Sequence, residues 1–378
     1  MSRVLLVTHE ATLSGAPRVA LLVARVLRDV GHDVDVVSRT DGPMLQEFAS
    51  ESRTRLEFAH RWRRRLWSYA PRRVALTVDL ILATATMLRH RPDIVYVNST
   101  SAAIYSRAAR LTKRPTNILH VHESGTNSDF FIRRAGLTLT SGDIRLVACS
   151  PSVRKELGVL LEVPESSIHL LLSVPDDREV RRSQPLPPGA ADDVDVLTIG
   201  CCGTAELRKG VDLWVDAATR IQAALPERRL SFPWVGSVDS ADRARWEAGS
   251  PIDFMGVRSD PYPVLRSFDV MVLPSRDDPF PLVVMEAMLL ARPIVAFDVG
   301  GVRDQLGDAG VVVPASDVDA LVGAVVSLVE DPTRRDELGR AAAERAEVLY
   351  TRSAFSTKLL QVLRPTPTAT RDQANMAL

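Results

Sequence analysis

The feature that most constrains the fold is an alternation of short apolar runs with helix-length segments, which stops once and then begins again. In the first half, five apolar runs typical of buried strands are separated by segments long enough to form helices: Val4–Val7, Val34–Val37, Ile94–Val97, Ile118–Val121 and Leu146–Cys149. Such an alternation predicts a parallel sheet covered by helices on both faces.

The alternation stops between Ser173 and Asp195, where the chain is rich in Pro, Asp and Arg and has no apolar period. This composition predicts a linker. The pattern then restarts with apolar runs at Val196–Cys202, Leu230–Val235, near Phe254, and at Val270–Leu273, Ile294–Phe297 and Val311–Val313. We therefore predict an α/β protein with two Rossmann-like, doubly wound domains at residues 1–175 and 195–350, a linker at 176–194, and a C-terminal helix and frayed tail at 351–378. Ligands of such sheets bind at the carboxyl ends of the strands, which would face one another across a cleft.

Composition narrows the class of protein. The 378 residues are 46% hydrophobic and carry a formal net charge of zero, which gives no overall attraction to nucleic acid, so no nucleic-acid partner is expected. The three cysteines, Cys149, Cys201 and Cys202, have no metal-binding spacing and fit a reducing, cytoplasmic compartment. The first ten residues lack the apolar core of a signal peptide, and the apolar stretch Val74–Leu88 is too short to span a bilayer.

The stretch SRDDPFPLVVMEAMLLARPIVAF places Asp278 before an apolar run and Glu286 inside it. We expect Phe280 to Val283 to form a helix N-terminus with Pro281 at its first position, where the N–H groups of Leu282 and Val283 favour a diphosphate. The two carboxylates would then hold sugar hydroxyls on either side of that diphosphate. The alternative is a helix cap at Asp278 and a Glu286 satisfied by a backbone amide.

Basic and glycine residues also follow strands. In GTAELRKG, Arg208 and Lys209 follow the first strand of the second domain, where two cations neutralise a charged leaving group. Gly15 lies in the first strand-to-helix loop, and Gly256 with Val257 lies in a later loop whose backbone groups are suited to a nucleotide base. The alternatives are an exposed Arg-Lys pair, a turn glycine and an ordinary loop.

The segment ILHVHES ends a strand with His120, His122 and Glu123. Two histidines and a carboxylate are also zinc ligands, but no third ligand at helical spacing accompanies them, so no metal is expected. His122 is better suited to a hydrogen bond with a polar ligand in the cleft. Arg61–Arg73 combines arginines with Trp62, Trp67 and Tyr69, a composition that fits an anionic membrane surface. A platform for single-stranded nucleic acid would use the same residues, and a solvated arginine face is the other alternative.

Together these stretches resemble the retaining glycosyltransferases of family four, also described as glycosyl transferases group 1, which have the GT-B fold. The likeness runs from Gly15 through VHE, RKG and FMGV to DPFPLVVMEAM and GGVRD. It implies a nucleotide-diphosphate sugar donor in the second domain and an acceptor carbohydrate or lipid-linked glycan in the first, in cell-envelope polysaccharide, glycolipid or other glycoconjugate synthesis. No cofactor or metal is expected.

Carried over by position, the resemblance implies that Glu286 holds the ribose, Arg208 and Lys209 the diphosphate, and Asp278 the transferred sugar. It places His122 at the reaction centre. Gly15 and the helix start at Phe280, Leu282 and Val283 would then lie by the phosphates, and Gly256 with Val257 by the base. The family usually has Glu at the position of Asp278, so the sugar preference is not implied.

Two other readings of the same residues stay open. One is a sugar-nucleotide epimerase or phosphorylase on the same scaffold, and the other is a non-catalytic polysaccharide-assembly protein. The expected location is the cytoplasm, at the inner face of the membrane if the Arg61–Arg73 segment binds it.

Overall fold

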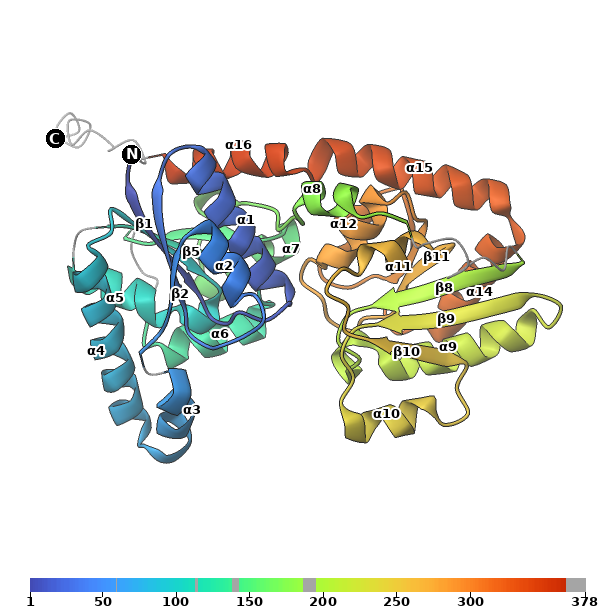
Figure 1. Ribbon diagram of the computed structural model, residues 1–378, viewed down its shortest axis with the longest axis horizontal. Coiled ribbons are helices and arrows are strands. Elements are labelled where there is room, and N and C mark those ends of the chain that lie inside the picture. The colour runs from blue at the N-terminus through green and yellow to red at the C-terminus, as the bar shows by residue number, and fades with distance from the viewer. Residues whose placement is uncertain (59, 113–114, 138–142, 186–194, 365–378) are drawn as a thin grey trace.

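The structure is a computed structural model that describes residues 1–58, 60–112, 115–137, 143–185 and 195–364, without the side chains at positions 62–66, 126 and 240. Two α/β domains lie side by side, with the N-terminal domain at the left of Figure 1 and the second domain at the right. The prediction of two doubly wound, Rossmann-like domains is confirmed.

The first domain is built on a parallel sheet whose described strands run in the order β3-β2-β1-β4-β5-β6-β7. The strands are β1 (Arg3–Thr8), β2 (Asp33–Ser38), β3 (Arg53–Leu56), β4 (Ile94–Asn98), β5 (Thr116–Val121), β6 (Arg145–Ala148) and β7 (His169–Leu170). The helices are α1 (Gly15–Asp29), α2 (Leu45–Glu51), α3 (His60–Tyr69), α4 (Arg72–His90), α5 (Ile104–Thr112), α6 (Gly125–Arg134) and α7 (Pro151–Leu161), with short 3-10 turns at Thr100–Ala102 and Glu165–Ser167.

The second domain is built on a parallel sheet with the described order β10-β9-β8-β11-β12-β13. The strands are β8 (Val196–Cys202), β9 (Arg229–Val235), β10 (Ile252–Gly256), β11 (Val270–Leu273), β12 (Ile294–Phe297) and β13 (Val311–Val313). The helices are α9 (Val211–Ala224), α10 (Ser240–Glu247), α11 (Tyr262–Arg266), α12 (Leu282–Leu289), α13 (Val302–Leu306) and α14 (Val318–Glu330), and a 3-10 turn covers Leu207–Lys209. In both sheets the strand order reverses direction beside the first strand, which is where α/β sheets bind ligands.

The segment expected to be an irregular linker contains a helix, α8 (Asp177–Arg182). The side chain of Asp176 caps it by accepting a hydrogen bond from the backbone N–H of Arg178 at 3.3 Å, and Val180 is buried. A helix of six residues is less than two turns long, too short to show a period in the sequence. The described part of the expected linker is therefore partly helical, and residues 186–194 lie outside the described residues.

Two C-terminal helices return the chain to the first domain. Helix α15 (Pro332–Leu349) packs on α12 of the second domain, and α16 (Arg352–Leu363) packs on α1 of the first. Figure 1 shows the two helices running along one side of the molecule and across both domains. The tail that we expected to be frayed, residues 365–378, lies outside the described residues.

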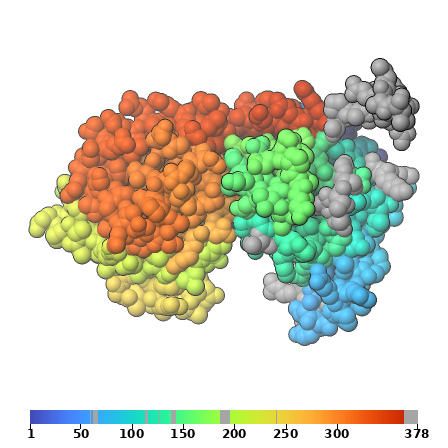
Figure 2. All heavy atoms as spheres, turned by 180° about the vertical axis from the view of Figure 1, so that it is seen from behind, coloured from blue at the N-terminus to red at the C-terminus, as the bar shows by residue number. Residues whose placement is uncertain are grey.

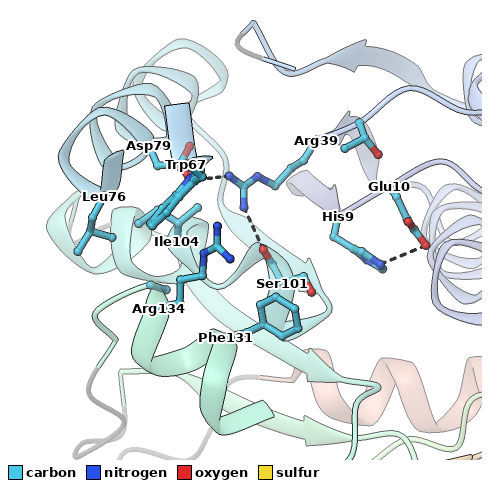
Figure 3. Close-up of a pocket in the computed structure, with 12 residues that line it drawn as sticks. His9, Glu10, Arg39, Trp67, Leu76, Asp79, Ser101, Ile104, Phe131 and Arg134 are labelled. Carbon is cyan, nitrogen blue, oxygen red and sulfur yellow. Dashed lines mark hydrogen bonds and ion pairs between the residues drawn. The ribbon is translucent and has the colours of Figure 1, made fainter. Parts of the chain in front are cut away.

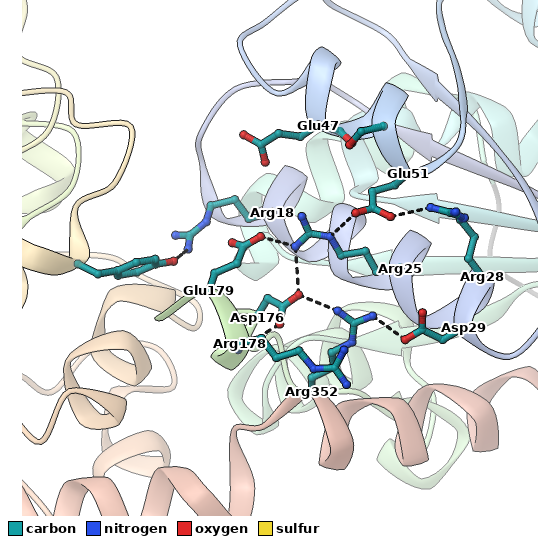
Figure 4. Close-up of polar contacts among 12 residues, drawn as sticks. Arg18, Arg25, Arg28, Asp29, Glu47, Glu51, Asp176, Arg178, Glu179 and Arg352 are labelled. Carbon is teal, nitrogen blue, oxygen red and sulfur yellow. Dashed lines mark hydrogen bonds and ion pairs between the residues drawn. The ribbon is translucent and has the colours of Figure 1, made fainter. Parts of the chain in front are cut away.

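Ion pairs hold this second crossing in place (Figure 4). Arg352 donates to Asp29 of α1 at 2.7 Å and to Asp176 at 2.9 Å, and Arg25 of α1 donates to the same Asp176 oxygen at 3.0 Å. The two domains are thus joined on one side, beneath α15 and α16. Figure 2 shows the surface notched between them on the opposite side.

Candidate active site

Glu286 lies in the second turn of α12, and its side chain is only 2% exposed to solvent. Its neighbours Val284, Met285, Ala287 and Met288 are all buried, so the carboxylate needs a partner to offset the loss of water. That partner comes from the other domain. Arg18 donates through Nη2 to Glu286 Oε1, and Tyr262 donates its hydroxyl to the same oxygen at 3.4 Å. No described residue hydrogen-bonds to the second oxygen, Oε2.

The first turns of α1 and α12 meet at this point. Gly15 opens α1, and a Cβ placed there would lie 3.6 Å from Cγ of Leu282, the first residue of α12. That distance is an ordinary van der Waals contact, so the two helix ends lie against each other, which carries Arg18 to Glu286. The structure thus brings together Gly15, Leu282 and Glu286, three of the residues singled out from the sequence. Pro281 is the residue before α12 rather than its first helical residue.

Lys209 and Asp278 form a second ion pair close to the domain boundary. Lys209 Nζ donates to Asp278 Oδ2, and the two side chains are 18% and 8% exposed. Oδ1 of Asp278 has no hydrogen-bond partner among the described residues. Arg208 points elsewhere: it is 45% exposed and donates to Glu206 at 2.8 Å and to the carbonyl of Asp277 at 3.0 Å. Lys209 is therefore the more enclosed of the two cations.

Glycines shape the loop that carries Asp278. Gly300 has a φ of +51°, and a Cβ there would lie 2.0 Å from the carbonyl oxygen of Asp278, which is a steric clash. The backbone N–H of Gly301 donates to the carbonyl of Pro279 at 3.0 Å. The Gly300-Gly301 pair after β12 thus packs directly against the backbone of the loop that precedes α12. Ser124 at the start of α6 reaches the same loop from the first domain, since its hydroxyl donates to Asp277 at 3.3 Å.

His122 follows β5 and uses both ring nitrogens within the protein. Nε2 contacts the side-chain oxygen of Asn98 at 3.0 Å and Nδ1 contacts the hydroxyl of Ser173 at 3.0 Å, so Nε2 carries the proton and Nδ1 accepts. Burial, aided by the neighbouring His120 and His9, lowers the pKa of His122 well below its usual value and keeps the ring neutral. A contact between His122 and a donor sugar stays a prediction.

The remaining predicted positions in the second domain are Gly256, Val257, Phe280 and Val283. Gly256 ends β10 with a φ of +72°, and its carbonyl accepts from the N–H of Gly236 at 3.0 Å, which leaves one lone pair of that oxygen. Val257 is 60% exposed. Phe280 lies two residues before α12, and its ring packs on Tyr350, the residue after α15, with centroids 6.3 Å apart. Val283 is partly buried in the first turn of α12.

A cavity of about 240 Å³ opens in the first domain beyond the ends of β1 and β2 (Figure 3). We call it the first-domain cavity. Its lining includes His9 and Glu10 after β1, Arg39 after β2, Trp67 of α3, Asp79 of α4, and Phe131 and Arg134 of α6. The contact with His9, at 3.4 Å, lowers the pKa of Glu10 to about 2, so this carboxylate is ionised near neutral pH.

The sequence reasoning missed Arg18, Tyr262, Asn98 and this cavity. Arg18 could have been found, because a cation in the first turn of the helix that follows the glycine loop faces the neighbouring domain. Tyr262 and the cavity could not, because their roles depend on how distant segments pack. Within the described residues no three potential metal ligands cluster, and no helix has the length and apolar content needed to cross a membrane.

Comparison with known proteins covers both domains. Residues 13–172 match the family model described as Glycosyltransferase Family 4, and residues 196–331 match the model described as Glycosyl transferases group 1. The chain is 27% identical over 228 residues to alpha-D-kanosaminyltransferase of Streptomyces kanamyceticus, covering 56% of this chain and 58% of that protein. It spans 58%, 53% and 38% of the length of three curated relatives that it matches.

Solved structures show the same fold over the whole molecule. Sucrose-phosphate synthase from Thermosynechococcus elongatus superposes with a TM-score of 0.78 at 20% identity, covering 96% of this chain and 98% of that one. Anabaena HepE in complex with UDP-glucose superposes with a TM-score of 0.75 at 17% identity, covering 96% and 99%. At these identities the likeness establishes the GT-B fold.

Proposed function

The chain belongs to the family 4 glycosyltransferases, with a second domain of the group 1 type, and we propose on this premise that it moves a sugar from a nucleotide-diphosphate donor to an acceptor hydroxyl with retention of the anomeric configuration. One observation carries the proposal. Lys209, Asp278 and Glu286 of the second domain converge with Arg18 of the first where two helix N-termini meet. This arrangement supplies positive charge for a diphosphate and carboxylate oxygens for hydroxyls on either side of it.

We assign the donor's parts to these groups by their free atoms. Glu286 Oε2 accepts from the ribose while Oε1 keeps Arg18, and Asp278 Oδ1 accepts from the transferred sugar while Oδ2 keeps Lys209. The N–H groups of Leu282 and Val283 and the ammonium of Lys209 face the diphosphate. Arg208 assists from the exposed side, and Gly256 with Val257 borders the base.

In the transfer step, the bond from the sugar's anomeric carbon to the diphosphate oxygen breaks, and a bond to the acceptor oxygen forms on the same face. The acceptor's proton passes to the departing diphosphate oxygen, so atoms and charge balance without an enzymic nucleophile. The chain's own contribution is to position both substrates and to stabilise the negative charge that develops on the diphosphate. Metal is not required in this proposal, because Lys209 and the α12 N-terminus supply the positive charge.

A thermal-shift screen of nucleoside diphosphates and their sugars tests the donor site. A ligand at a hundred times its dissociation constant stabilises the folded state by about 2.7 kcal/mol. We expect one nucleotide sugar to raise the melting temperature of the wild type and of Lys155→Ala, an exposed lysine on α7, but not of Lys209→Ala. No shift with any nucleotide would contradict the proposal, and turnover of the sugar nucleotide without an acceptor alcohol would favour an epimerase.

We also propose that the α3–α4 hairpin binds an anionic membrane surface at the cytoplasmic side. Val74, Ile81 and Leu88 are spaced seven residues apart on α4 and are 49%, 61% and 62% exposed, so they form one apolar stripe. Tyr69 at the end of α3 is 87% exposed, and Arg72 and Arg73 stand at the start of α4. The side chains of Arg63, Arg64 and Arg65, which we singled out from the sequence, lie outside the described residues.

Vesicle sedimentation tests this surface. We expect binding to vesicles rich in phosphatidylserine that falls with added salt and is lost in Ile81→Ser combined with Arg73→Ser. The matched control is Val159→Ser, a 76% exposed apolar residue on α7. Equal binding by the double variant and the control would remove membrane attachment from the proposal while leaving the transfer reaction unaffected.

A further inference from the structure

The first-domain cavity contains two buried polar atoms that no described residue satisfies. Asp79 is 4% exposed; Arg39 donates to its Oδ2 at 2.9 Å and Trp67 Nε1 donates to the same oxygen at 3.0 Å. Oδ1 of Asp79 and Nδ1 of His9 are both buried, and neither atom has a hydrogen-bond partner among the described residues. A buried polar atom without a partner costs free energy, so both atoms call for a ligand that donates hydrogen bonds.

Arg134 gives the cavity a cation that forms no ion pair with a described carboxylate, although Asp79 is near enough to attract it electrostatically. Its guanidinium lies over the Trp67 ring, with Cζ 4.2 Å from the ring centroid, and no described residue accepts a hydrogen bond from it. Arg39, the other cation in the lining, differs because its three nitrogens donate to Glu57, Ser101 and Asp79. The donors of Arg134 therefore remain for a ligand with acceptor oxygens, and a guanidinium suits a planar or tetrahedral oxyanion.

These groups occupy different ends of the cavity. Figure 3 shows Arg134 and Trp67 on one side and His9 with Glu10 on the other. His9 also lies near His122, since the two rings influence each other electrostatically. The His9 end therefore faces His122, which the family resemblance places at the reaction centre, and the Arg134 end lies away from it. A volume of about 240 Å³ is room for one substituted ring rather than a chain of sugars.

We propose that the first-domain cavity binds an acceptor ring that carries both hydroxyls and an anionic substituent, a phosphate or a carboxylate. Hydroxyls donate to Asp79 Oδ1 and His9 Nδ1, and the anionic group accepts from Arg134. This inference rests on the transfer reaction proposed above, since it names the class of acceptor. The same chemistry is offered by a free phosphorylated sugar and by the headgroup of a phosphorylated lipid.

Isothermal titration tests the anion contact with glucose 6-phosphate, myo-inositol 1-phosphate and glucuronate as probes. We expect at least one of them to bind the wild type more tightly than glucose and inorganic phosphate do. Arg134→Gln should weaken that probe about tenfold or more, the loss of a charge-assisted hydrogen bond, and leave glucose unchanged. The control Arg133→Gln removes a neighbouring arginine that is 74% exposed and paired with Asp129, and it should stay within about twofold of the wild type.

Vesicles that carry phosphatidylinositol distinguish the two sources of the anionic ring. If the protein binds these vesicles but none of the soluble probes, and Arg134→Gln abolishes the vesicle binding, the ligand is the lipid headgroup. If a soluble probe binds, the ligand is the free sugar. The proposal fails if no probe in either form binds saturably up to about 10 mM, or if Arg134→Gln binds as tightly as the wild type. Nucleoside diphosphate binding, measured in the same preparations, tests the donor site independently of the cavity. The affinity for the nucleoside diphosphate should be the same in the wild type and in Arg134→Gln.

Discussion

Arg18 and Glu286 form an ion pair across the domain boundary, with the guanidinium of α1 donating to the carboxylate that α12 carries into an apolar core. Removing the cation leaves a carboxylate that is 2% exposed without a charged partner. Breaking a wholly buried pair costs about 3–5 kcal/mol, and because Arg18 is 23% exposed we expect Arg18→Leu to lower the free energy of unfolding by about 1–3 kcal/mol.

Urea denaturation measures this loss, and Arg28→Leu provides the control because Arg28 lies on the same helix in an exposed pair with Glu51. In Arg18→Leu combined with Glu286→Gln, the two changes should be less than additive, since the double variant buries no unpaired charge. Stability equal to that of the wild type in Arg18→Leu alone would show that water, rather than Arg18, satisfies Glu286.

Glu286→Gln should weaken ribonucleotide binding about tenfold, because a hydroxyl bound to a charged acceptor loses strength when the acceptor becomes neutral. The comparison ligand is the matching 2′,3′-dideoxynucleotide, which has no ribose hydroxyls to donate. Its affinity should be the same for the wild type and the variant. If the variant weakened both ligands equally, the effect would come from a displaced α12 rather than from a lost ribose contact.

Two glycines offer a matched test of the loop that carries Asp278. Gly300→Ala places a Cβ 2.0 Å from the Asp278 carbonyl oxygen at a φ of +51°, so the loop must move, and we expect loss of both stability and donor binding. Gly323→Ala lies within α14 with no atom close to the added carbon, and should stabilise the fold by up to about 1 kcal/mol. Equal melting temperatures for the two variants would contradict this.

His120 and His122 are buried histidines with lowered pKa values, so the stability of the fold should depend on pH. Burial lowers the pKa of His120 to about 3, where its neutral ring accepts from Tyr96 at 2.8 Å and donates to the Leu171 carbonyl at 3.2 Å. Below pH 6.5 the unfolded chain binds a proton at this residue and the folded chain does not. Stability therefore falls as the pH drops from about 6.5 toward 3, by up to about 1.4 kcal/mol per pH unit and per histidine.

Denaturation between pH 6.5 and 5 emphasises the histidines, because most of the Glu10 contribution comes near and below its unfolded value of 4.5. His122 and His169, whose pKa values burial also lowers, add to the same slope. His120→Gln should reduce the slope in that window. An unchanged slope would assign the dependence to other groups.

The fold and the donor side of the site follow from local sequence patterns. Buried strands such as β8 and β11 appear as apolar runs, and Glu286 is conspicuous because a charge interrupts such a run. The edge strand β3 has the sequence RTRL, which lacks any apolar run, and it forms because β2 offers it unpaired backbone groups.

The partners of the site residues depend on contacts distant in sequence, which a single chain does not display. Glu286 was expected to depend on a ligand, yet Arg18, 268 positions earlier, already pairs with it. Likewise the first-domain cavity exists only because α3, α4 and α6 pack around the ends of β1 and β2.

The return of α16 to the first domain has a mechanical consequence. The chain joins the two domains twice, near Asp176 and again near Arg352, and both crossings meet in one cluster of ion pairs. The two crossings define a line between the domains. A rotation of one domain about that line stretches neither crossing. Such a rotation would change the separation of Arg18 from Glu286 and leave the Asp176 cluster in place, so any opening of the site along this line would be a swing about a fixed axis.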